Sequence, residues 1–253
     1  MLTQNQIKQI KSLHQKKNRT EEKLFIAEGP KLVEEMLGSK FTFAGIYAKK
    51  EWLTDNSDRL INKNISFTEI NDKELERIST QATPNKVLAV INIPEQIIPM
   101  GIFGKELILM LDDIKDPGNL GTIIRTANWF GINHIFCSEN SSELYNPKVV
   151  QSTMGSIAKV NVYYTNLSTL LKANVNGVNV YGTFMNGESI YNISPDKNGV
   201  IIIGNESGGI SDDLLSLVTK KIAIPLHKNQ NQHSPESLNA SIATAILCYE
   251  FRR

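Results

Sequence analysis

The sequence is poor in cysteine and has no long apolar run. Cys137 and Cys248 are the only cysteines among 253 residues, so a disulfide framework is not expected and a reducing environment is. No apolar run approaches the roughly 20 residues that cross a bilayer, and the N-terminal stretch lacks the apolar centre of a secretory signal peptide. A cytoplasmic protein without membrane association is therefore expected.

Common catalytic signatures are missing as well. There is no G-x-x-x-x-G-K-[S/T] phosphate loop, so an NTPase is not expected. There is no G-x-S-x-G turn, so a serine hydrolase is not expected either. His227 and His233 lie close together in the sequence, but no cysteine or carboxylate cluster accompanies them. We therefore expect no metal site.

The sequence also has almost no excess of one charge over the other. The formal net charge is only +1 at pH 7, which does not mark a nucleic-acid binder. Residues 1–23 are an exception, because they hold six Lys or Arg against Glu21 and Glu22. Such an arm can contact phosphate groups even on a neutral protein, although a solvated amphipathic helix is the simpler interpretation. The basic side chains are Lys8, Lys11, Lys16, Lys17, Arg19 and Lys23.

Hydrophobic periodicity divides the chain into two blocks. In residues 1–97, Ile7, Ile10 and Leu13 recur at helical spacing, and strand patterns then alternate with helix patterns, as is typical of a small α/β domain. The stretch IPEQIIPMGIFGK, residues 93–105, contains two Pro and two Gly, which favours a boundary near residue 98. We therefore expect one domain at 1–97 and a second at 98–253.

The second block contains strands that are apolar at consecutive positions, such as ELILMLDDI at 106–114. This pattern is typical of a parallel sheet that is buried on both faces, so the predicted fold class is α/β. Ligands in such folds bind beyond the carboxyl ends of the strands. Three segments are expected there: 112–119, 203–209 and the turn after residue 226.

The first of these segments leads into DPGNLGTIIRTANWFG, residues 116–131. The pattern predicts a helix from Leu120 to Phe130 with Asn119 at its N-cap. It is neither a dinucleotide-binding fingerprint nor a P-loop. Taken alone, the segment favours a plain interpretation, in which Asn119 only caps the helix and Arg125 only adds solubility.

The other two segments are also open to two interpretations. GNESGG at 204–209 has glycines that allow a ligand or another backbone to come close, with Glu206 as a nearby carboxylate; alternatively, Glu206 only caps the next helix. Ser237-Leu238-Asn239 precedes an apolar helix, where its hydroxyl and amide would form the wall of a site. The alternative is that Ser237 or the segment 234–236 caps that helix.

In this order and spacing, the three segments resemble the SpoU (TrmH-like) branch of the SPOUT RNA ribose 2′-O-methyltransferases. The family's first motif is matched in PGNLGTIIRTA by Asn119, Gly121, Arg125 and Ala127, its second by GNESGGIS from Gly204, and its third by IPL at 224–226 with SLNASIATAILCYE from Ser237. The first block resembles the L30e-like substrate-binding domain often attached to this family, through KNRTEEKLFIAEGPKLVEE and ISTQATPNKVLAVI.

The resemblance implies a C-terminal parallel-sheet domain with a trefoil knot, and S-adenosylmethionine as the cofactor. It also implies a homodimer packed through the knot region and a structured RNA as substrate, with rRNA favoured over tRNA. The family usually has a short Gly-containing turn before SLN, whereas residues 226–236 are longer and lack Gly; this loop is expected to cover the cofactor or to contact RNA through Lys228. The implied cofactor-binding residues are Thr183, Phe184, Gly204, Ile224, Leu226 and Leu238.

The implied reaction is methylation of a ribose 2′-hydroxyl. A guanidinium stays charged in proteins, so Arg125 is expected to bind an RNA phosphate and stabilise the developing alkoxide, although the family proposal makes this arginine the general base. Asn119, Ser237 and Asn239 would hold the ribose, and Glu206 would orient Asn119 or Arg125. Three alternatives remain: a tRNA methyltransferase, a non-catalytic RNA-binding protein that kept the fold, and a small-molecule nucleotide-binding enzyme.

Overall fold

The computed structural model describes residues 1–99, 101–226 and 237–253. The chain divides into two compact units. The first unit consists of Met1–Glu95 and Glu143–Lys159, and the second of Gln96–Ser142 and Val160–Arg253. A segment from the middle of the sequence, Glu143–Lys159, therefore folds with the N-terminal residues.

The first unit is a four-stranded sheet with helices on it, in the strand order β1-β4-β2-β3. Strand β4 is antiparallel to β1 and β2, and β3 is parallel to β2. The elements in chain order are α1 (Gln4–Ser12), α2 (Lys16–Glu22), β1 (Leu24–Glu28), α3 (Pro30–Leu37), β2 (Phe43–Ala48), α4 (Lys50–Asn62), β3 (Phe67–Glu69), α5 (Asp72–Ile78), β4 (Val87–Asn92), α7 (Pro147–Ser152) and η1 (Ser156–Ala158).

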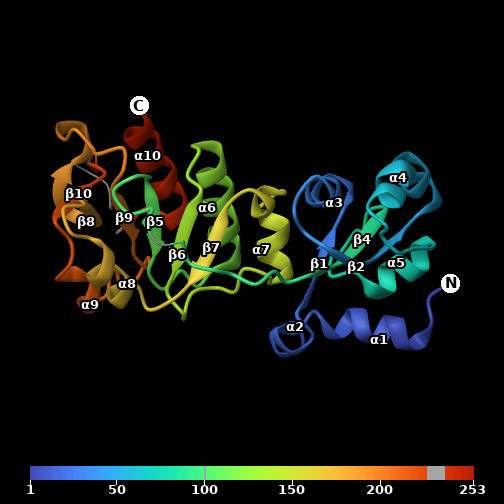
Figure 1. Cartoon of the computed structure of the whole chain (residues 1–253). Helices are drawn as coiled ribbons and strands as arrows, with labels where there is room; N and C mark the ends of the chain where they lie inside the picture. Colours follow the sequence, from blue (N-terminus) through green and yellow to red (C-terminus); the bar gives the residue numbers. More distant parts are fainter. Residues whose placement is uncertain (100, 227–236) are drawn as a thin grey trace. The chain divides into compact units, whose positions relative to one another are not determined.

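Helices α1 and α5 cover one face of this sheet (Figure 1). The predicted helical stripe is confirmed, because Ile7, Ile10 and Leu13 are buried against α5 and the strands. On the segment that comes from the middle of the chain, the ring of Tyr145 lies 4.6 Å from the ring of Phe25. The inserted segment thus contributes to the core of the first unit, since aromatic contacts of this kind stabilise a fold.

Arg19 joins the two parts of the first unit. Its guanidinium is only 2% exposed and forms an ion pair with Glu143, with Nε donating to Glu143 Oε1 at 3.1 Å. It also donates to the carbonyl of Leu13 at 2.8 Å. Neither interpretation of the basic stretch, a solvated helix or a phosphate-binding arm, therefore holds for Arg19. The other basic side chains of the arm are exposed lysines: Lys8, Lys11, Lys16, Lys17 and Lys23.

Replacement of Glu143 by glutamine is expected to lower the free energy of unfolding of the first unit by about 3 kcal/mol, because it leaves a buried guanidinium without a counter-charge. Urea denaturation measures this loss. The control is Glu21→Gln in the exposed Lys17–Glu21 pair, whose atoms are 3.9 Å apart; its effect should be about 0.5 kcal/mol or less. Equal effects of the two substitutions would show that the buried pair is not stabilising.

The second unit is a six-stranded sheet in the order β10-β8-β9-β5-β6-β7, and every neighbouring pair is parallel. This confirms the predicted parallel α/β fold class. The elements are β5 (Ile108–Leu111), α6 (Pro117–Trp129), β6 (His134–Cys137), β7 (Asn161–Tyr164), α8 (Leu167–Asn174), β8 (Val180–Ser189), η2 (Ile190–Asn192), β9 (Val200–Ile203), α9 (Asp212–Leu215), β10 (Lys220–Ala223) and α10 (Ala240–Arg252).

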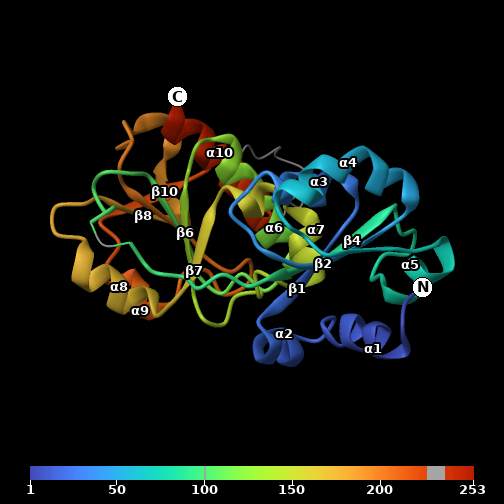
Figure 2. The same ribbon diagram turned by 45° about the vertical axis from the view of Figure 1, so that its right-hand side comes forward.

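Helices cover both faces of the parallel sheet (Figures 1 and 2). Helices α8 and α9 pack through Leu167, Leu171 and Leu214 onto one face. Helix α10 lies on the other face, where Phe251 meets Tyr181 with the ring centroids 4.8 Å apart, and it packs beside α6. Because the strands are buried on both faces, their sequences are apolar at consecutive positions.

The central strands end level with one another. Leu111 at the end of β5 is paired with Ile203 of β9 and with Cys137 of β6. The loops after these three strands therefore start at the same edge of the sheet. That edge is where a parallel α/β sheet binds ligands.

Candidate active site

Helix α6 begins three residues earlier than the sequence indicates. Its N-cap is Asp116, whose Oδ1 accepts a hydrogen bond from the Asn119 backbone N–H at 2.8 Å. Pro117 takes the first helical position, where proline lacks only a donor that would be unpaired anyway. The prediction that Asn119 is the N-cap is therefore wrong. Because Asp116 caps the helix, the side chain of Asn119 is available for contacts elsewhere.

The three motif segments meet through Asn119. Its Nδ2 donates to Glu206 Oε1 at 2.5 Å, and its Oδ1 accepts from Asn239 Nδ2 at 2.9 Å. Segments 87 and 120 residues away from Asn119 in the sequence are thus joined by two hydrogen bonds. Of the two partners proposed for Glu206, the structure brings Asn119 to it.

Asn239 is also the N-cap of α10. Its Oδ1 accepts from the backbone N–H of Ser241 at 3.0 Å and from that of Ile242 at 3.4 Å. The alternative that Ser237 caps this helix is therefore wrong, and the segment 234–236 lies outside the described residues. One amide group both starts the helix and holds Asn119.

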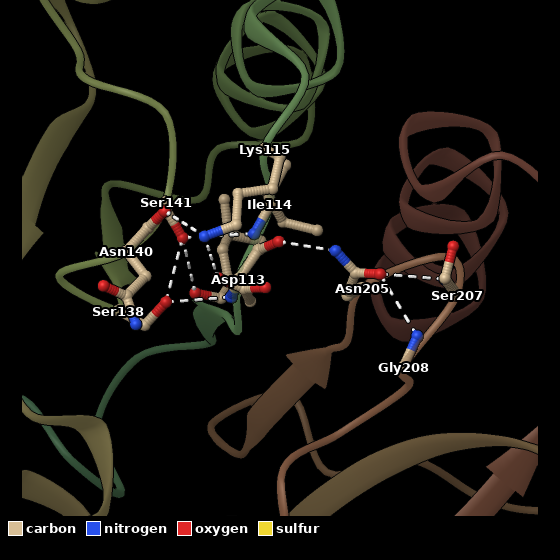
Figure 3. A network of polar contacts seen from close by, with 10 residues as sticks. Asp113, Ile114, Lys115, Ser138, Asn140, Ser141, Asn205, Ser207 and Gly208 are labelled. Carbon is tan, nitrogen blue, oxygen red and sulfur yellow. Dashed lines mark hydrogen bonds and ion pairs between the residues drawn. The ribbon is translucent and has the colours of Figure 1, made fainter.

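The loop that carries Asn119 toward the site is supported from both sides (Figure 3). Asp113 has a φ of 60°, and its backbone N–H donates to Ser138 Oγ at 2.8 Å. Lys115 Nζ lies 2.6 Å from Asp113 Oδ1 and donates to the carbonyl of Asn140 at 2.9 Å. On the other side, Asn205 Nδ2 donates to the carbonyl of Asp113 at 2.9 Å. The loop is thus tied to the loops after β6 and β9.

Arg125 and Ser237 do not join these hydrogen bonds. Arg125 is exposed on α6, six residues beyond Asn119 and so about 9 Å further along the helix axis. Among the described residues, neither side chain has an ion-pair or hydrogen-bond partner in the protein. Each is therefore open to a ligand, whereas Asn119, Glu206 and Asn239 hold one another.

The residues expected to bind the cofactor lie on β8 or directly after β9 and β10, except Leu238, which lies just before α10. Gly204 follows β9 directly, and a Cβ there would lie only 2.4 Å from the backbone carbon of Gly209, so only glycine fits. Leu226 and Leu238 are 45% and 44% exposed, which leaves apolar surface for an adenine or methionine group. The close approach at Gly204 is to the chain's own backbone, so the exposed apolar side chains of Leu226 and Leu238 are what fits S-adenosylmethionine here.

Strand β8 is interrupted beside β10. Gly182 is paired with Lys221, but the next pair along is Glu188 with Ile222, so the intervening residues leave the ladder. Thr183 and Phe184 stand at the start of this bulge, where Thr183 Oγ1 donates to the carbonyl of Ile202 at 3.2 Å. Ile224 directly follows β10. The long loop with Lys228, His227 and His233 lies outside the described residues.

The described part of the chain shows no group of three His, Cys, Asp or Glu side chains that could hold a metal ion, and no helix in it is long and apolar enough to cross a membrane. Both cysteines are free and buried. Burial raises the pKa of Cys248 to about 12 and raises that of Cys137 further. Neither thiol is therefore ionised at neutral pH, so neither is an activated nucleophile.

Comparison with known proteins identifies the family that carries this site. The sequence matches the SpoU rRNA Methylase family over residues 106–249. The chain belongs to the SpoU rRNA methylase family. The first unit contributes a second match, because residues 4–89 match the MRM3-like substrate binding domain.

Individual SpoU relatives agree along the whole chain. The chain is 31% identical to the 23S rRNA (guanosine(2553)-2′-O)-methyltransferase RlmP of Bacillus subtilis, over 97% of this chain and 95% of the relative. A TrmH-family structure from Porphyromonas gingivalis is 38% identical with a TM-score of 0.87, and covers 100% of this chain and 98% of its own. The AdoMet-bound rRNA methyltransferase of Sinorhizobium meliloti is 28% identical with a TM-score of 0.86, and covers 100% of this chain and 95% of its own.

Sequence reasoning missed the residues that support the SpoU site. Asp116 had a readable signal, because an aspartate directly before a proline is typical of a helix start. Asn205 and Asp113 had none, since their bond joins positions 92 residues apart. Asp116 caps the helix that carries Asn119, and Asn205 directly precedes Glu206 in the chain.

Proposed function

We propose that this chain transfers the methyl group of S-adenosylmethionine to a ribose 2′-hydroxyl of rRNA. The single observation that supports the proposal best is the hydrogen-bonded set Glu206–Asn119–Asn239, which joins all three motifs of the family at the carboxyl edge of the sheet. A non-catalytic RNA-binding protein would not need this set. RNA is also the substrate named for the Bacillus subtilis relative, which is an rRNA enzyme.

S-adenosylmethionine supplies an activated methyl group as the electrophile. The protein's part is to align the ribose hydroxyl with that methyl, and alignment can supply most of the barrier reduction. Asn119 uses one N–H on Glu206 and one lone pair on Asn239, so one N–H and one lone pair remain for the ribose. Ser237 stands exposed one residue before Leu238 and adds a hydroxyl to the same site.

Arg125 contacts the RNA in this proposal. Its guanidinium is exposed and has no protein partner among the described residues. It is therefore available for bidentate binding of a phosphate beside the reacting ribose. A fixed positive charge there also stabilises the alkoxide that develops as the hydroxyl attacks.

The proposal includes a homodimer, the trefoil knot that the resemblance implies, and a cytoplasmic location. Trp129 is 84% exposed at the end of α6, and Ile242 and Tyr249 are exposed seven residues apart on the same face of α10. Large apolar side chains gathered on two packed helices support a covering subunit. The location is supported by the RNA substrate and by two cysteines that are both free.

Replacement of Tyr249 by glutamate is expected to shift the protein from dimer to monomer, because it places a charge in the centre of the proposed interface. Sedimentation velocity measures the change. Tyr191→Glu is the control, because Tyr191 is exposed on η2 and so lies outside both α6 and α10. A monomeric wild-type protein would end this part of the proposal.

The activity is tested by incubating the protein with S-adenosylmethionine and unmodified RNA fractions. Large-subunit rRNA, small-subunit rRNA and tRNA are assayed separately, and the digested nucleosides are analysed by mass spectrometry. The expected product is a 2′-O-methylnucleoside in an rRNA fraction. A methylated base would contradict the ribose assignment, and activity confined to tRNA would contradict the choice of rRNA.

A further inference from the structure

Asn205 is a half-buried loop residue that makes several hydrogen bonds. Its Nδ2 donates to the carbonyl of Asp113 at 2.9 Å, and its Oδ1 accepts from the backbone N–H groups of Ser207 at 2.8 Å and Gly208 at 3.1 Å. Its backbone N–H and carbonyl also bond to Gly209 at 3.0 Å and 2.9 Å. Figure 3 shows this amide between the two loops.

Of the two loops that Asn205 joins, one carries a member of the hydrogen-bonded set and the other leads into the helix that carries another. The loop after β9 carries Glu206, the next residue in the chain. The loop after β5 leads through Asp116 to Asn119, because Asp116 caps α6. A second tie runs from the Ser211 backbone N–H to Asp112 Oδ2 at 2.8 Å, so the bond made by Asn205 is the one nearest to Glu206.

The chemistry of this position requires an amide. The side chain must donate to the Asp113 carbonyl and accept from two backbone N–H groups at the same time, and only an amide of this length does both. Aspartate keeps the acceptor but places a carboxylate oxygen against the Asp113 carbonyl oxygen. Serine keeps an acceptor for Ser207 but is too short to reach Asp113.

We propose that Asn205 is a positioning residue for methyl transfer, which sets the separation between Glu206 and Asn119; this inference rests on the proposed function. The Asn119–Glu206 bond is 2.5 Å long, so a shift of about 1 Å would break it. Displacements of this size in a site can lower turnover by about 10²-fold. Asn205 itself acts through Glu206 and Asn119.

The test compares Asn205→Asp with the wild-type protein in kinetics and in NMR. The expected result is a kcat about 10²-fold lower, with the KM for RNA and the calorimetric Kd for S-adenosylmethionine within about threefold of wild type. The side-chain NH₂ resonance of Asn119 should shift in Asn205→Asp and in Glu206→Gln. The control, Asn176→Asp in an exposed turn, makes the same charge change and should move neither kcat nor that resonance.

The proposal is overturned if kcat stays within about threefold of wild type, if KM or Kd changes as much as kcat, or if the Asn119 resonance does not move. Should Asn205→Asp fail to fold, Asn205→Ser is judged by the same criteria. The NMR comparison needs no turnover. An inactive wild-type protein would therefore contradict the proposed function, while the resonance still decides the role of Asn205.

Discussion

Replacement of Asn119 by alanine is expected to lower kcat by about 10² to 10³-fold, the usual effect of removing one hydrogen-bonding group that acts on the transition state. Two losses combine in this variant. The ribose loses the remaining donor and acceptor of the amide, and Glu206 and Asn239 lose the group that holds them together. The fold should persist, because Asp116 still caps α6 through the backbone of residue 119.

Single-turnover methylation of the rRNA fraction measures this effect. Asn176→Ala, at an exposed turn of the same unit, is the matched control and should keep full activity. Asn119→Asp is a sharper variant, because it places a second carboxylate against Glu206 and should be at least as inactive near neutral pH. A kcat for Asn119→Ala within about threefold of wild type would remove Asn119 from the site.

Replacement of Arg125 by alanine is expected to lower kcat/KM for RNA by about 10² to 10³-fold, because it removes both a phosphate contact and a charge near the developing alkoxide. Binding of S-adenosylmethionine should not change, since the residues proposed for the cofactor lie on β8, after β9 and β10 or before α10, and none lies on α6. The kcat/KM of Arg125→Lys should fall between those of the wild type and Arg125→Ala, because lysine keeps the charge but not the bidentate geometry.

The salt dependence of RNA binding separates the two roles of Arg125. Loss of one phosphate contact should reduce the slope of log K against log salt by about one. Fluorescence anisotropy with a labelled rRNA fragment gives that slope, and the Arg125→Lys variant is the control that should keep it. Near-wild-type turnover of Arg125→Ala at saturating RNA would contradict its role at the alkoxide, and an unchanged slope would contradict the phosphate contact.

The sequence predicted the second unit well because its signals are local. Continuous apolar runs indicate a parallel sheet buried on both faces, and the polar segments after those runs had to meet at one edge. The start of α6 was predicted wrongly for a local reason too. Asp116 competes with Asn119 for the cap, and an aspartate cap followed by a proline at the first helical position is the better combination.

What could not be predicted depends on distant partners. Arg19 stands among polar and charged neighbours in the sequence, so its pattern is that of a solvated side chain. Its partner Glu143 lies 124 residues away, and no periodicity connects them. The two roles of Asn239 differ in the same way. A helix cap can be predicted from the residues that follow it, whereas the bond from Asn239 to the distant Asn119 cannot.

Because Glu143–Lys159 folds with the first unit, the N-terminal domain cannot be cut out or exchanged as one continuous stretch of sequence. A fragment that ended near residue 97 would lose Glu143 and Tyr145, which would leave Arg19 without its counter-ion and Phe25 with one face uncovered. An exchange of N-terminal domains between relatives would meet the same obstacle. The unit that can be exchanged consists of two separate stretches of sequence. A new N-terminal domain must therefore be transferred together with its own α7, or part of its core is missing.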